Sequence, residues 1–261
     1  MRRWTPAMVL ALAGSALTGA PATSAAAVGD PVTAIQHQMV EGRGVRVVVH
    51  RTYNDGRGWR RFKPTKGVVG FGAGKVVATD LVDHQVGGSR DICIGKHLWQ
   101  KGPLQTHVKD KKWVRYPWTC ELRLAAGDLR LDKPAVLAAV LSTTTSERPS
   151  GTYDEVSTTL HQGVMTFRRL WEVLPELRPE PEDERGSWPI EWRLWVGEDD
   201  LVRRAWVRWR RPDHSSFKGA THGQGWFGFV EDIRYADWGM KLTIKPPPPA
   251  QTRAISIPAA G

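Results

Sequence analysis

The chain of 261 residues contains little cysteine and no long apolar run. Its two cysteines are too few for a small domain held by several disulfides, or for a zinc site built from cysteines. No stretch of eighteen apolar residues occurs, which argues against an ordinary transmembrane helix. Hydrophobic residues make up 41% of the chain and charged residues 25%, which are ordinary globular values and exclude disorder of the whole chain.

The motifs of the common enzyme classes are missing as well. There is no H-E-x-x-H and no G-x-S-x-G, and the glycines of 67–74 precede neither a helix nor a P-loop Lys-Ser/Thr pair. The cluster Asp213-His214-Ser215 and the pair His214 and His222 read as loop positions rather than as a triad or a metal site. We therefore expect a protein that is not an enzyme and that holds no cofactor and no metal.

Residues 1–27 have the pattern of a secretory signal. Arg2 and Arg3 precede a short apolar stretch at 8–20, and Ala25-Ala26-Ala27 forms an A-x-A-like cleavage site. An N-terminal membrane anchor is the alternative, but the apolar stretch is short and rich in small residues. We expect cleavage near Ala27, an exported soluble monomer with one domain over 28–250, and a flexible tail over 251–261.

Positive charge predominates, with Lys+Arg 37 against Asp+Glu 27, a net charge of +10, and thirteen tryptophans. This balance favours anionic partners such as membrane headgroups or wall polymers. Nucleic acid is not expected, because the chain carries an export signal and no nucleic-acid-binding motif. In an oxidising compartment Cys93 and Cys120 are predicted to form a disulfide, with two free buried thiols as the alternative.

Alternating and helical patterns predict the secondary structure. A helix is expected at 32–39, and strands begin with the alternation of Val45, Val47 and Val49. Further strands are predicted at 67–71, 75–83, 90–94, 97–100, 113–117 and 152–160, with a turn at 148–151. Two more helices are expected, one at 135–141 capped by Asp132 and one from Phe167 to Leu174 capped by Thr166.

The last third of the chain predicts four strands and their inward faces. The inward residues of the first two strands are Ile190, Trp192, Leu194 and Val196, then Leu201, Ala205, Val207 and Trp209. Those of the last two are Phe227, Phe229, Ile233 and Tyr235, then Met240, Leu242 and Ile244. The predicted fold class is α+β, mainly antiparallel β, with a large curved sheet and two or three helices against one face.

Two segments resemble those of a known superfamily. The stretch G-E-D-D-L-V-R-R at 197–204 resembles the D-x-x-G-L-V-R-R hairpin of the LolA/LolB/RseB superfamily, and 235–247 resembles its closing Y-x-D-(W/Y)-G segment with two prolines. Weaker likenesses occur at 78–80 and 113–117. The resemblance is to the lipoprotein branch of high-GC Gram-positive bacteria, which includes mycobacterial glycolipid carriers, although this chain has no cysteine near position 27 for lipid attachment. It implies an open half-barrel with a helical lid, acyl chains on an apolar concave face, and no catalytic residues.

Large side chains on the predicted inward faces are compatible with such a site. An apolar cavity suits lipid tails because they form no hydrogen bonds. The alternative is that the same residues simply fill a core. The candidates are Val47, Val49, Phe167, Leu170, Trp171, Trp192, Leu194, Val207, Trp209, Phe229, Ile233 and Tyr235.

Arginine and tryptophan alternate on the opposite face of the same strands. Their stacking could meet an anionic membrane surface or wall polymer, or the residues could form an ordinary solvated face. The candidates are Arg193, Trp195, Arg204, Trp206, Arg208, Arg210, Lys241 and Lys245. The leading hypothesis is a carrier of lipids or lipidated molecules, and the alternative is an RseB-like module that binds a protein or a wall polymer through this basic face.

Overall fold

The computed structural model describes residues 30–55, 58–84, 88–103, 112–116, 120, 122–180, 184–211 and 227–255. The predicted signal at 1–27, the Asp213-His214-Ser215 cluster and His222 lie outside these residues. The fold is mainly antiparallel, with a thirteen-stranded sheet, a separate two-stranded hairpin and three α-helices in the described parts, which confirms the predicted fold class.

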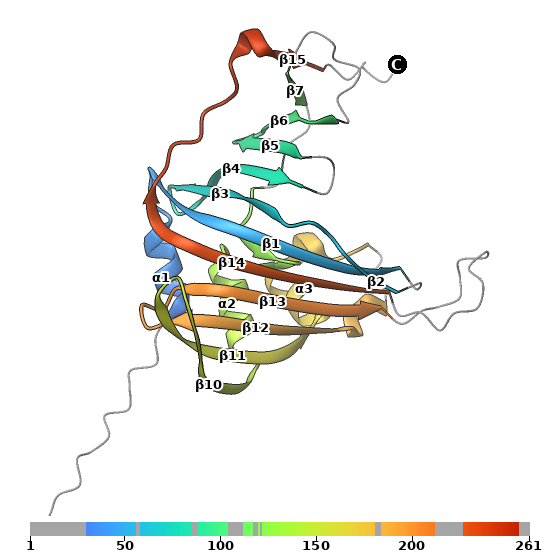
Figure 1. The fold of residues 1–261 in the computed structure, drawn as a ribbon. Helices are drawn as coiled ribbons and strands as arrows, with labels where there is room; N and C mark the ends of the chain where they lie inside the picture. Colours follow the sequence, from blue (N-terminus) through green and yellow to red (C-terminus); the bar gives the residue numbers. More distant parts are fainter. Residues whose placement is uncertain are drawn as a thin grey trace, which may run out of the picture.

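The large sheet runs in the order β10-β11-β12-β13-β14-β1-β3-β4-β5-β6-β7-β15, and β2 pairs with β1 off this path (Figure 1). All of its pairs are antiparallel except β15 with β7. The first strands of the chain are β1 (Arg43–Asp55), β2 (Trp59–Arg61), β3 (Thr65–Gly72), β4 (Lys75–Asp83), β5 (Ser89–Ile94), β6 (His97–Lys101) and β7 (Trp113–Tyr116). The later strands are β10 (Thr144–Tyr153), β11 (Val156–Thr166), β12 (Pro189–Gly197), β13 (Val202–Arg211), β14 (Phe227–Lys241) and β15 (Thr252–Ala254).

The helices α1 (Pro31–Gln38), α2 (Pro134–Leu141) and α3 (Phe167–Val173) lie on one side of the sheet, at its β10–β14 half (Figure 1). The hairpin of β8 (Ala125–Ala126) and β9 (Leu129–Arg130) contacts β13 and β14 on that same inner face. Single-turn 3₁₀ helices cover 175–177, 184–187 and 249–251. Each α-helix has seven or eight residues, and no helix in the described ranges is long and apolar enough to cross a membrane.

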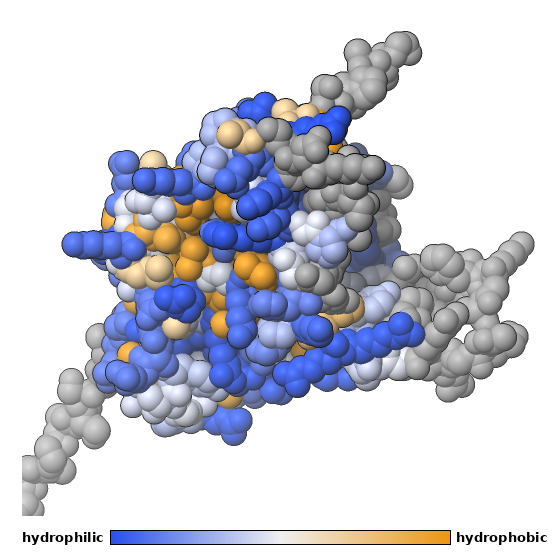
Figure 2. Space-filling model, turned by 45° about the horizontal axis from the view of Figure 1, so that its top comes forward, coloured by the Kyte–Doolittle hydropathy of each residue, from blue (hydrophilic) through white to orange (hydrophobic). Residues whose placement is uncertain are grey.

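The core lies between the helices and the inner faces of β11–β14, β1, β3 and β4. Ile35, Leu137, Leu170, Trp192 and Val207 are all buried there, with exposures of 0 to 1%. Thr166 caps α3 as predicted, since its hydroxyl accepts a hydrogen bond from the Arg169 amide. Hydrophilic residues cover most of the face in Figure 2 and surround a small group of hydrophobic ones.

Asp132 does not cap α2, although its position before Pro134 predicted that role. The N-cap is Lys133, which makes no side-chain cap bond. The Asp132 carboxylate instead accepts from Arg130 at 2.8 and 3.0 Å and from the Leu124 amide. The buried ion pair has taken the oxygens that a cap would need, because an unpaired charge inside the protein is costly.

Three further predictions about strands are wrong. Residues 148–151 are not a turn but part of β10, an edge strand where the missing amide hydrogen of Pro149 breaks no ladder. Met240 belongs to β14, which continues past a bulge at Asp237 and Gly239, both with positive φ, so 240–244 is no separate strand. The tail after Gln251 is not wholly loose, since β15 pairs in parallel with β7.

Candidate functional site

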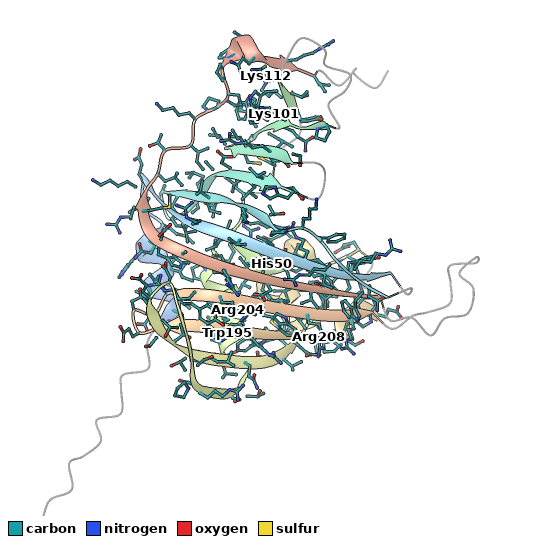
Figure 3. All side chains as sticks on the ribbon, viewed as in Figure 1. His50, Lys101, Lys112, Trp195, Arg204 and Arg208 are labelled. Carbon is teal, nitrogen blue, oxygen red and sulfur yellow. The ribbon has the colours of Figure 1, made fainter. Side chains whose placement is uncertain are left out.

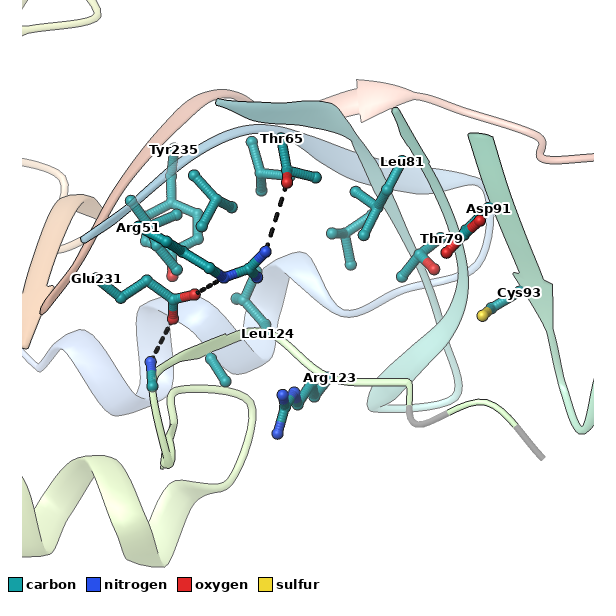
Figure 4. A pocket seen from close by; sticks show the side chains of 16 residues that line it. Arg51, Thr65, Thr79, Leu81, Asp91, Cys93, Arg123, Leu124, Glu231 and Tyr235 are labelled. Atoms are coloured by element: carbon teal, nitrogen blue, oxygen red, sulfur yellow. Dashed lines mark hydrogen bonds and ion pairs between the residues drawn. The ribbon is translucent and has the colours of Figure 1, made fainter. Parts of the chain in front are cut away.

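A cavity of about 240 Å³ lies on the inner face of the sheet, away from the helices. Strands β14, β1, β3, β4 and β5 form its wall, and the segment 123–127, which contains β8, closes it from the opposite side (Figure 4). Its apolar lining is Val47, Val49, Val69, Leu81, Leu124 and Ile233. Its polar lining includes Arg51, Thr65, Thr79, Asp91, Arg123 and Glu231. The cavity is therefore amphipathic rather than apolar throughout.

Strand alternation places these side chains inside. In β1, Val47, Val49 and Arg51 point to the inner face because successive residues alternate between faces. The register pairs Val49 with Ile233 and Arg51 with Glu231. Glu231 thus occupies the inward position between Phe229 and Ile233, which the apolar pattern passed over. The strict period of two was the signal that could have identified it.

Arg51 and Glu231 form the polar centre of the cavity. Arg51 Nε lies 2.7 Å from Glu231 Oε1, and Arg51 Nη1 donates to Thr65 Oγ1 at 3.4 Å. The other carboxylate oxygen of Glu231 accepts the Gly127 amide. The Glu231 side chain is only 6% exposed, so these charge-assisted bonds compensate its burial and tie the 123–127 segment to the sheet.

Two other oxygens of the cavity wall have no such partner. Tyr235 is 2% exposed, and its hydroxyl makes no hydrogen bond with any described residue. Burial, and then the charges of Glu231 and Asp132, raise the pKa of Tyr235 well above its usual value. On β5, Asp91 Oδ1 is buried without a partner, and burial is the main cause that raises the pKa of Asp91.

Two further spaces continue along the inner face. One of about 300 Å³ shares Arg51, Arg123, Gly127 and Glu231 with the first cavity and adds Trp209 and Phe229. Another, of about 160 Å³, lies against α3 and is lined in part by Phe167 and Trp171. The main cavity and the space of about 300 Å³ are therefore neighbours around the Arg51–Glu231 pair.

The structure divides the twelve predicted cavity residues among these places. Val47, Val49, Ile233 and Tyr235 line the main cavity, Trp209 and Phe229 the second space, and Phe167 and Trp171 the third. Leu170, Trp192, Leu194 and Val207 are buried in the core with exposures of 0 to 1%, as the alternative of a filled core predicted. The main cavity thus lies beside the helical half of the sheet rather than under α3.

Six of the eight residues predicted for the basic face lie on β12 and β13, and Figure 3 labels Trp195, Arg204 and Arg208 among them. Lys241 is the last residue of β14, and Lys245 lies beyond it. Arg204 lies 4.4 Å from the Trp195 ring centroid, and Arg193 lies 4.6 Å from that of Trp206. Carboxylates neutralise part of this surface, since Arg204 binds Asp232 at 2.6 and 2.8 Å and Arg208 binds Glu191. Hydrogen bonds from Arg204 to Asp232 raise the pKa of the Arg204 guanidinium. Arg210, Lys241 and Lys245 are exposed.

The segments that carry the family resemblance meet at one corner of the sheet. Arg203, 6% exposed at its side chain, binds Asp199 of its own hairpin and Asp154 of the β10–β11 turn. Asp154 also accepts the Asp237 amide, and the Trp238 indole donates to the Val202 carbonyl. These residues join two turns and the β14 bulge, so their role is structural and lies outside the cavity.

The predicted disulfide is not present. Cys93 and Cys120 are both free thiols, although each lies within interaction range of the other. Cys120 donates to the His97 carbonyl at 3.3 Å. Burial, and then the Cys120 thiol, raise the pKa of Cys93 to about 12. The fold brings the two cysteines close together, as the prediction required, but the sulfurs are unbonded.

Among the residues that the structure describes, no group of three or more His, Cys, Asp or Glu side chains is placed to hold a metal ion.

No protein-family model matches the sequence, and no curated protein matches it. Several solved structures are similar to the chain, including the following two. The crystal structure of lipoprotein LppX from Mycobacterium tuberculosis has 14% sequence identity and a TM-score of 0.42, covering 82% of this chain and 98% of that one. A DUF1329 family protein from Desulfovibrio piger has 10% identity and a TM-score of 0.32, covering 82% and 92%. Both similarities concern the architecture alone.

Proposed function

We propose that this protein is an exported, non-catalytic binder or carrier of a lipid or acylated ligand in the cell envelope. The observation that carries the proposal is the amphipathic cavity on the inner face of β14, β1, β3, β4 and β5. Its apolar wall suits an acyl chain, and its charged centre suits the polar end of an amphipathic molecule.

Size supports the same function. Ligand pockets typically enclose about 300–1,000 Å³. The main cavity of about 240 Å³ and its neighbour of about 300 Å³ together reach this range, and they share the Arg51–Glu231 pair as a common wall. An acyl chain longer than the main cavity could therefore continue past that pair toward Trp209 and Phe229.

The alternative is an RseB-like module that binds a protein or an anionic wall polymer through its outer basic face. The cation–π pairs of Arg193 and Arg204 support it. We favour the carrier, because Asp232 and Glu191 already neutralise Arg204 and Arg208 at the centre of that face.

Native mass spectrometry of the mature protein, purified from a secreting bacterial host, tests the proposal. We expect an added mass that solvent extraction releases as a lipid. Leu81→Trp would fill the cavity and should abolish this mass. Val164→Trp adds the same ring at a position of β11 that is 49% exposed, and it should keep the mass. A wild-type protein that stays bare after incubation with envelope lipids would refute the carrier function and favour the outer face.

A further inference from the structure

The unpartnered hydroxyl of Tyr235 points to the chemistry of the bound molecule. A buried hydroxyl normally has a hydrogen-bond partner, because leaving it unpaired costs about 1–3 kcal/mol. Tyr235 is 2% exposed, lines the main cavity and makes no hydrogen bond with any described residue. The missing partner can therefore come from a molecule in the cavity.

The charges around the cavity indicate which kind of group this is. Arg51 is already bound to Glu231, which lies on the same strand as Tyr235 (Figure 4). An anionic group there would be repelled by Glu231 and a cationic one by Arg51. The lining contains two arginines, Arg51 and Arg123, and two carboxylates, Glu231 and Asp91, so their formal charges balance. An uncharged group fits this environment best.

Asp91 provides a second, independent contact for such a group. Its Oδ1 is buried on β5 without a partner, on the opposite part of the same wall. A carboxylate oxygen accepts hydrogen bonds, and a phenol both donates and accepts them. A molecule with one or more hydroxyls can satisfy either atom, whereas a hydrocarbon or a simple ester supplies no donor for Asp91.

We infer that the cavity takes an amphipathic molecule whose polar end is uncharged and hydroxylated, with the Tyr235 hydroxyl as one of its hydrogen-bond partners beside the Arg51–Glu231 pair. This inference rests on the proposed function. It assigns Tyr235 a binding role, while Val47, Val49 and Ile233 form the apolar wall beside it.

Three probes with the same acyl chain separate the possibilities: monoolein, which has two hydroxyls, methyl oleate, which has none, and oleate, which is anionic. Binding to delipidated protein is measured by displacement of a fluorescent fatty probe. One neutral hydrogen bond corresponds to about 3- to 10-fold in affinity. We expect wild-type protein to bind monoolein by at least this factor more tightly than either other probe.

Tyr235→Phe should weaken monoolein binding by about this same 3- to 10-fold factor. Methyl oleate, whose ester can accept a hydrogen bond from the phenol but donate none, should lose less. The matched control is Tyr153→Phe, which deletes a hydroxyl that Arg204 already binds at 2.8 Å on the outer face, and it should keep the preference. Thermal melting checks the fold, and Tyr235→Phe should melt no lower than wild type because no described partner loses a bond.

The outcomes distinguish the two levels of the proposal. If no probe binds the wild type, the proposed function fails. If all three bind and Tyr235→Phe weakens them equally or not at all, the carrier function stands but the inference is overturned. Oleate binding tighter than monoolein would refute the uncharged polar end.

Discussion

Replacing Arg203 by alanine should destabilise the corner at which the β10–β11 turn, the β12–β13 turn and the β14 bulge meet. Arg203 Nη1 lies 2.9 Å from Asp154 Oδ2, its Nη2 binds Asp199, and its side chain is only 6% exposed. The variant loses two charge-assisted hydrogen bonds, each contributing about 1.5–3 kcal/mol. Asp154 and Asp199 are 28% and 41% exposed, so water can rehydrate them once the arginine is gone. We therefore expect the free energy of unfolding to fall by about 3 kcal/mol, which is the lower end of the range for a broken buried ion pair.

Urea unfolding followed by tryptophan fluorescence measures this loss, and a thermal scan should show a melting temperature lower by about 6–12 °C. Arg46→Ala is the matched control, because its ion pair with Asp237 is 55% and 47% exposed and should contribute at most about 1 kcal/mol. The double variant Arg203→Ala/Asp154→Ala should lose less than the sum of the two single losses. If Arg203→Ala were no less stable than Arg46→Ala, the corner would not be a structural clamp.

Three further predictions concern packing, thiol reactivity and alkaline pH. Gly163→Ala should lower the free energy of unfolding by about 1–3 kcal/mol, because the new Cβ would lie 2.1 Å from the Thr143 carbonyl oxygen and 2.7 Å from the Trp192 ring. The control Gly151→Ala meets no atom within 4 Å, so it should be near neutral in the same urea assay. Because its pKa is raised to about 12, Cys93 should react with iodoacetamide at pH 8 far more slowly than Cys120. Peptide mass mapping over time measures the two rates, and equal rates would contradict the burial of Cys93. Because the pKa of Tyr235 is raised in the folded state, the unfolded chain loses this proton at a lower pH than the folded protein does. The contribution of Tyr235 to stability is therefore fully present below pH 10 and is lost above it by about 1.4 kcal/mol per pH unit. Tyr235→Phe should lack this part of the alkaline loss, and identical pH profiles of the two proteins would refute the assignment.

Local periodicity was sufficient for most elements. The alternation of Val45, Val47 and Val49 predicts β1, and the spacing of Phe167, Leu170 and Trp171 behind Thr166 predicts α3 with its cap. These signals succeed because each strand or helix presents one face to the core whatever its neighbours are. The same alternation shows that Val47, Val49, Ile233 and Tyr235 share the inner face.

The sequence by itself therefore determined most of the elements, most of their inward faces and the mainly antiparallel class. Only the tertiary structure decided that α3 packs on a filled core while the cavity lies beside it under β3, β4 and β5, because the space left depends on which elements meet. It also decided that Pro149 lies in an edge strand, that β15 returns to β7, and that Glu231 is buried. Each depends on a partner far away in the chain. Glu231 can be buried because Arg51, 180 residues earlier, and the Gly127 amide, 104 residues earlier, bind both of its carboxylate oxygens.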